Sequence, residues 1–282
     1  MADDIVVPEG HQRCRKEVQP EDDPEPQAQG SASEPPGSRH LPFNYKGRPL
    51  QTQKCALSHD YTFAMFPVSD VIPSRTTPYV TVGLMILNAL VFLYELQLTR
   101  PELQLFALIF GVVPAHFSWP TLFTSLFLHE GWLHLFGNML YLWIFGDNVE
   151  DRLGHFGYLV FYLACGAMAA LGQVAVSTGS MIPMIGASGA IAGVMGAYFV
   201  LYPHSRVLTV VFLVFFMDMI EIPAIFFLGI WFVKELFSGV GSLGAQSLNG
   251  GVAFWAHVVG FAVGALAGLF WRIREPRQPT WI

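Results

Sequence analysis

The sequence predicts an all-α, polytopic membrane protein with six transmembrane helices. Hydrophobic residues make up 53% of the 282-residue chain, more than a soluble domain of this size carries. After the first 62 residues the apolar residues gather in segments that are long enough to cross a bilayer and contain few charges. A helix of about 20 residues spans the hydrocarbon core, so each of these segments is a candidate span.

Three regions follow from the composition. Residues 1–62 are rich in Pro, Glu, Asp, Gln and Ser, and we expect them to form a disordered cytoplasmic tail because they bury too little apolar surface to fold. Residues 63–272 are expected to form the membrane domain, and residues 273–282 a short cytoplasmic C-terminal tail.

The hydropathy pattern gives the expected position of each element. The six spans are expected near residues 79–98, 131–145, 157–176, 185–202, 222–237 and 252–271. Residues 105–128 are apolar but interrupted by Gly111, Pro114 and Pro120, so we expect a first external loop that is embedded in the membrane and contains short helical pieces. Segment 207–219 is apolar but too short for a span.

The arginine and lysine residues orient the chain. Six crossings place both chain ends on one side of the membrane. Most basic residues of the short loops fall on that side, namely Arg75, Arg152, Arg206, Arg272, Arg274 and Arg277. Arg100 and Lys234 belong to the other side. By the positive-inside rule both termini are cytoplasmic, and we expect a bacterial inner membrane.

The polar residues exclude several kinds of site. The net charge of −6 comes with no clustered basic face, which argues against nucleic-acid binding. The three cysteines are too few and too scattered for a disulfide framework. His11, Cys14, Cys55 and His59 are zinc-ligand types, but the long separation between the two pairs favours isolated residues over a metal site. We expect neither a metal nor a cofactor.

Two spans begin with residues suited to nucleophilic catalysis. Ser188 lies a few residues into the fourth span and His257 a few residues into the sixth, and both spans start on the external side. The two side chains are therefore expected at similar depth. A serine hydroxyl needs a base to take its proton, and a neutral imidazole does this. An ionisable histidine in a membrane is expected to face the bundle interior and a partner.

The second span adds two further polar groups at that depth. His134 and Asn138 are four residues apart and share one helical face. Both can donate a hydrogen bond to a developing oxyanion. The first backbone N–H groups of the helix that begins near Ser188 can do the same.

Each element also has a purely structural interpretation. Gly186 and Gly189 belong to a glycine-rich stretch that is also typical of helix packing, and His134 and Asn138 are also suited to hydrogen bonding between helices. We assign the glycine triplet of the sixth span, Gly260, Gly264 and Gly268, to packing. Four polar groups on three helices at one depth favour a site over packing alone.

These residues resemble the rhomboid family of intramembrane serine proteases, over residues 65 to 272. The matching motifs are Gly186-Ala187-Ser188-Gly189 with Gly193, Ala256-His257-Val258-Val259-Gly260, His129 with His134-x-x-x-Asn138, and Glu150-x-Arg152-x-Gly154. Two positions depart from the family pattern. Ala192 stands where many members have a tyrosine that stacks on the histidine, and Trp119-Pro120 stands where many have Trp-Arg.

The resemblance implies a rhomboid-like six-helix bundle with protease activity. Ser188 would be the nucleophile and His257 the general base, with no third acidic member. His134, Asn138 and the Ser188 backbone N–H would form the oxyanion hole. Five residues have supporting roles in the resemblance: Gly186, Gly189 and His129 near the site, and Glu150 with Arg152 as a cytoplasmic contact. Substrates would be membrane proteins with unstable transmembrane helices, and the oligomeric state stays open.

Access to such a site needs water and a route for the substrate. We expect a polar cavity beneath the external surface, covered by the glycine- and serine-rich segment 238–251, which is expected to move together with the fifth span. Two other functions remain open. One is a catalytically silent rhomboid-like protein that binds membrane clients, and the other is a small-solute transporter with a polar site at the midplane.

Overall fold

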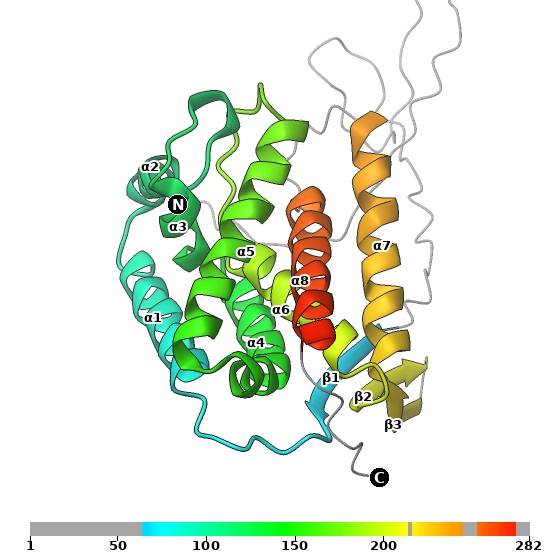
Figure 1. Ribbon diagram of the computed structural model, residues 1–282. Helices are drawn as coiled ribbons and strands as arrows, with labels where there is room; N and C mark the ends of the chain where they lie inside the picture. Colours follow the sequence, from blue (N-terminus) through cyan, green and yellow to red (C-terminus); the bar gives the residue numbers. More distant parts are fainter. Residues whose placement is uncertain (1–63, 214–215, 245–252, 275–282) are drawn as a thin grey trace, which may run out of the picture. The chain divides into compact units, whose positions relative to one another are not determined.

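The computed structural model describes residues 64–213, 216–244 and 253–274, and Figure 1 shows long helices with a small sheet next to the start of α7. The predicted tail, the four zinc-ligand types within it and residues 275–282 lie outside the described residues. The same holds for residues 245–252 of the expected mobile cover.

Six helices occupy the predicted spans. They are α1 (Tyr79–Glu95), α4 (Trp132–Leu153), α5 (His155–Val176), α6 (Ser188–Leu201), α7 (Ala224–Gly244) and α8 (Phe254–Arg274). Among the described residues, α5, α7 and α8 are long and apolar enough to cross a membrane, whereas α1 and α6 are apolar but shorter. The predicted helical membrane fold is confirmed.

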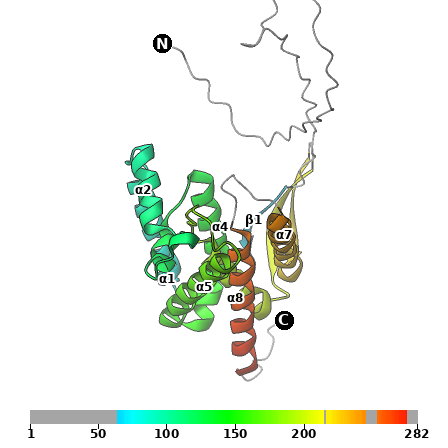
Figure 2. The same ribbon diagram turned by 90° about the horizontal axis from the view of Figure 1, so that it is seen from above.

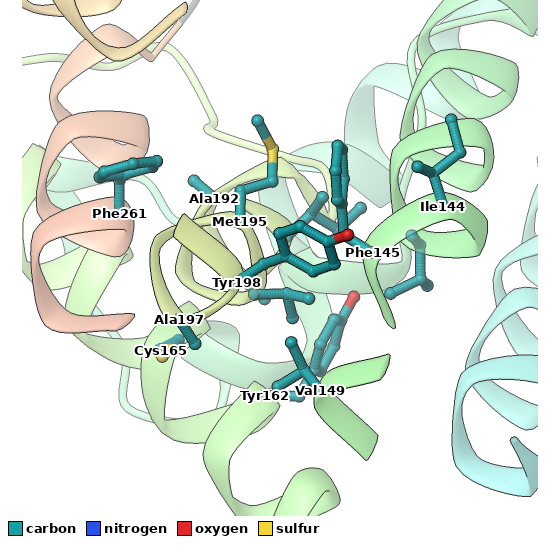
Figure 3. Close-up of a cluster of buried hydrophobic side chains, with 14 of the residues drawn as sticks. Ile144, Phe145, Val149, Tyr162, Cys165, Ala192, Met195, Ala197, Tyr198 and Phe261 are labelled. Atoms are coloured by element: carbon teal, nitrogen blue, oxygen red, sulfur yellow. The ribbon is translucent and has the colours of Figure 1, made fainter. Parts of the chain in front are cut away.

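α6 is the central helix of the bundle. Every residue from Gly189 to Tyr198 is buried, and α6 contacts α4, α5, α7 and α8. Figure 3 shows the buried hydrophobic side chains around α6, among them Tyr198 and Phe145 of α4. These two rings lie edge to face, with centroids 4.9 Å apart. Because α6 begins at Ser188, this packing fixes the position of that serine.

The glycines of α8 pack against α6, as predicted. A Cβ added at Gly260 would lie 2.2 Å from the Gly189 carbonyl oxygen, and one added at Gly264 would lie 1.8 Å from that of Gly193. Only glycine permits so close an approach. Such contacts hold helices together in lipid, where apolar burial gives little driving force.

A three-stranded antiparallel sheet was not predicted. Its strands are β1 (Ala64–Asp70), β2 (Arg206–Leu213) and β3 (Phe216–Pro223), in the order β1-β2-β3. Segment 207–219, which is too short for a span, therefore belongs to the antiparallel strand pair β2 and β3. Val207, Thr209 and Val211 alternate inward and are buried, which is the period-two pattern of β-branched residues in a strand.

Polar contacts connect the sheet and the helix ends. Tyr198 Oη donates to Asp70 Oδ2 over 2.6 Å, and Asn148 Nδ2 donates to the same oxygen over 2.9 Å. The Glu150 carboxylate accepts the backbone N–H groups of Val80 (2.9 Å) and Thr81 (2.8 Å). These donors belong to the first turn of α1, where helical N–H groups lack partners within the helix.

Arg152 also lies at this end of α4. It lines a small cavity together with Arg75, Asn148 and Tyr202. This end of α4 is opposite to the end that carries His134.

The first external loop contains short helical pieces, as predicted. They are α2 (Arg100–Phe110), η1 (Pro114–His116), α3 (Thr121–Thr124) and η2 (Ser125–Phe127). Figures 1 and 2 place α2 at the side of the bundle far from α7. α2 has no buried residue and exposes Leu105, Leu108 and Ile109. Its insertion into the membrane stays a prediction.

The prediction that segment 238–251 forms a mobile cover is partly wrong. α7 continues to Gly244, so residues 238–244 are helical rather than a loop. Ser242 Oγ donates to the Gly239 carbonyl oxygen (2.6 Å), and Trp255 Nε1 of α8 donates to the same oxygen (3.2 Å). The glycine and serine residues of segment 238–244 therefore belong to α7, which is hydrogen-bonded to α8 at Gly239.

Candidate active site

Ser188 and His257 are in hydrogen-bond contact. The distance from Ser188 Oγ to His257 Nε2 is 2.8 Å. Ser188 is the first residue of α6, and His257 lies in the first turn of α8. The His257 side chain is 12% exposed, so it lies largely inside the bundle. The structure thus brings together the two residues that the sequence analysis paired, in a geometry suited to proton transfer.

The turn before Ser188 depends on Gly186. Its φ is 118°, in the left-handed region where a side chain is strained. The Gly186 N–H donates to the Ser125 carbonyl oxygen over 2.8 Å. Just upstream, Met184 and Val112 exchange two backbone hydrogen bonds. These contacts hold the entry to α6 against the first external loop.

His134 and Asn138 both reach this turn. A Cβ added at Gly186 would lie 2.6 Å from His134 Nε2 and 3.8 Å from Asn138 Nδ2. Asn138 Nδ2 lies 2.9 Å from Nε2 of the fully buried His129, and the rings of His129 and His134 have centroids 5.0 Å apart. A cluster of hydrogen-bonding side chains therefore lies beside the N-terminus of α6, where free N–H groups also point.

An acidic residue lies on the other side of His257, although the resemblance implies none. Glu235 Oε2 of α7 is 2.8 Å from His257 Nδ1, and the Glu235 residue is only 4% exposed. The Lys234 ammonium lies 3.2 Å from the other carboxylate oxygen. One signal in the sequence points to Glu235: an acid within an apolar span is expected to face the bundle interior and a partner.

An aromatic ring also flanks His257. The Trp231 ring of α7 has its centroid 5.9 Å from that of His257, at a tilt of 38°. Ala192 is fully buried in α6 and has no ring to stack on the imidazole. α7 therefore supplies two side chains against His257, a carboxylate and an indole.

Comparison with known families identifies the domain that carries these residues. The model of the Rhomboid domain family matches residues 116–274, a range that includes Ser188, Glu235 and His257. This chain is a member of the rhomboid family.

Similar proteins come from several compartments. This rhomboid is 29% identical over 150 residues to mitochondrial Rhomboid protein 1 of Saccharomyces cerevisiae, covering 52% of this chain and 40% of the relative. It is 42% identical over 80 residues to Rhomboid protease GluP of Bacillus subtilis, covering 28% of this chain and 15% of the relative. It is 35% identical over 96 residues to human mitochondrial Presenilin-associated rhomboid-like protein, covering 33% of this chain and 24% of the relative.

Two conclusions follow from these relatives. The matches span less than half the length of each of these three proteins. The family membership rests on the Rhomboid domain match over residues 116–274. Because mitochondrial proteins stand among the relatives, the likeness does not support the expected bacterial inner membrane.

Proposed function

We propose that this rhomboid is an intramembrane serine endopeptidase. Ser188 is the nucleophile and His257 the general base. The observation that carries the proposal is the 2.8 Å contact between Ser188 Oγ and His257 Nε2. A hydroxyl in contact with a largely buried imidazole is the arrangement that activates a serine.

The reaction proceeds by acyl transfer. His257 Nε2 takes the Ser188 proton as Oγ attacks the carbonyl carbon of the scissile bond. The tetrahedral intermediate collapses when the imidazolium gives that proton to the leaving amine, which leaves an ester on Ser188. His257 then takes a proton from water, the hydroxide attacks the ester, and the imidazolium returns the proton to Oγ as the new carboxyl product leaves.

The oxyanion of each intermediate has donors nearby. His134 and Asn138 lie beside Gly186, two residues before the nucleophile. We assign His134, Asn138 and the Ser188 backbone N–H to the oxyanion hole. Removal of one such donor in an enzyme typically lowers kcat by about 10²–10³-fold.

The substrates of this proposal are membrane proteins with locally unstable transmembrane helices. A peptide bond inside a helix is shielded by its neighbours and must unwind before Oγ reaches it. By the positive-inside rule, the arginine-rich ends of the helices lie on the inner side of the membrane, and Ser188 lies below the opposite surface.

A transmembrane reporter tests the proposal. The full chain in liposomes is assayed as wild type, Ser188→Ala and His257→Ala. Two matched controls are Ser177→Ala, whose hydroxyl bonds the carbonyl of Gln173 in its own helix, and His204→Ala, an exposed histidine. We expect cleavage by the wild type and both controls, and none by the two site variants. Equal processing by all five proteins would remove the protease claim, and no cleavage by any of them would favour a silent client-binding rhomboid.

A further inference from the structure

We propose that Glu235 orients His257, as an acidic positioning residue that completes a Ser188, His257 and Glu235 arrangement. The inference rests on the proposed protease function and extends it. Three helices contribute one residue each, and two contacts of 2.8 Å connect Glu235 Oε2, the two imidazole nitrogens and Ser188 Oγ in series.

The contact with Glu235 fixes the tautomer of His257. An ionised carboxylate only accepts hydrogen bonds, so the Nδ1 that faces Glu235 carries the hydrogen. Nε2 then presents its lone pair to the Ser188 hydroxyl. This is the tautomer a general base needs, and the carboxylate also stabilises the imidazolium that forms during attack.

The Glu235 carboxylate is buried in the bundle. A carboxylate inside a helical bundle is costly unless both oxygens find partners. Glu235 is 4% exposed, with His257 on one oxygen and the Lys234 ammonium on the other. The Lys234 side chain is 70% exposed and reaches the oxygen from outside. The imidazole is therefore the buried partner that stabilises the Glu235 carboxylate.

The α6 position that carries a stacking tyrosine in many rhomboids is an alanine in this chain. Ala192 has no ring to hold the imidazole. Glu235 and Trp231 lie on the same face of α7, one helical turn apart, and both contact the His257 ring. The orientation of His257 in this chain thus comes from α7 instead of α6.

A purely structural role predicts different behaviour. If the Glu235 contact only held α7 against α8, its loss would change substrate entry and hence KM, or would speed cleavage by opening the bundle. A small fluorophosphonate that needs no helix movement would still label Ser188 at the normal rate. Under the positioning role, labelling and kcat fall together while KM stays constant.

The experiment uses the full chain in detergent with Glu235→Gln, Glu235→Asp and Glu235→Ala. Lys234→Met is the matched control, because it removes the exposed partner and leaves the His257 contact. The readouts are the rate of fluorophosphonate labelling of Ser188 and, separately, kcat and KM on the reporter. Glu235→Gln keeps the side-chain shape, so it decides the question even if Glu235→Ala does not fold.

We expect Glu235→Gln and Glu235→Ala to lower labelling and kcat by about 10–10²-fold at constant KM. Glu235→Asp keeps the charge and should label faster than Glu235→Ala, and Lys234→Met should label like the wild type. Wild-type labelling and kcat in Glu235→Gln, or a change confined to KM, would overturn the positioning role while the protease stands. A wild type that neither labels nor cleaves would overturn the proposed function and this inference with it.

Discussion

Gly264 of α8 lies directly against the carbonyl oxygen of Gly193 in α6, and a Cβ at Gly264 would stand 1.8 Å from that oxygen. The obstacle is backbone, which cannot rotate away as a side chain can. This contact lies two helical turns from His257, so it also sets the separation of the helices that carry Ser188 and His257.

Gly264→Ala should therefore push α8 away from α6. We expect a loss of about 1–3 kcal/mol in the free energy of unfolding, typical of overpacking, and slower labelling of Ser188. The control is Gly137→Ala on α4, where an added Cβ meets nothing within 4 Å. Thermal unfolding in detergent measures both variants, and equal stability of the two would contradict the close packing.

Gly186→Ala tests the turn before the nucleophile. The φ of 118° disfavours alanine, and its Cβ would lie 2.6 Å from His134 Nε2. We expect kcat to fall by about 10-fold or more, because the strain displaces a proposed oxyanion donor. Gly179→Ala, in the same loop with open space around it, should cleave the reporter normally. A normal kcat in Gly186→Ala would show that His134 is not needed there.

Glu150→Ala tests the contact between α4 and α1. It removes the acceptor for the backbone N–H groups of Val80 and Thr81 and the 2.6 Å contact with His155 Nδ1. We expect a loss of about 1–3 kcal/mol in the free energy of unfolding, because the backbone N–H donors are left without their acceptor. The exposed Glu130→Ala is the comparison. The melting temperatures of the two variants should differ by several degrees, and coincident melting would refute the role.

Asp70 predicts a pH dependence of stability. Burial raises the pKa of Asp70 from 3.8 to about 6, although the Tyr198 hydrogen bond opposes the rise. A raised folded-state pKa means that the protonated form favours the fold, so this contribution is complete below pH ~4 and is lost as the pH rises through ~6. Asp70→Asn should flatten the stability profile between these values. The exposed Asp218→Asn should leave it unchanged, and a profile of Asp70→Asn that matches the wild type would remove Asp70 as the cause.

The sequence predicted the helices well because hydropathy and length decide membrane spans. It did not predict the sheet, because the alternation at Val207, Thr209 and Val211 stands within a run of apolar residues and the pairing strand β1 lies more than a hundred residues away. The predicted end of α7 was wrong because glycine and serine residues such as Gly239 and Ser242 are typical of loops. In the structure they are helical, and Trp255 of α8 donates a hydrogen bond to the Gly239 carbonyl oxygen.

The site residues also include some that the sequence predicts and one that it does not. Ser188 and His257 were found because each has a motif and a depth within a span. Glu235 has no motif around it, and an acid in a span reveals a partner only when the helices are placed. Which face of α7 meets α8 depends on packing over the whole bundle.

The most direct test of the account is the rate at which a fluorophosphonate modifies Ser188, with the modified residue identified by mass spectrometry. The account predicts rapid labelling at Ser188 in the wild type and labelling slowed by about 10²-fold or more in His257→Ala. Labelling of Ser188 at the same rate in both proteins would contradict it, because His257 would then not be the group that activates the hydroxyl.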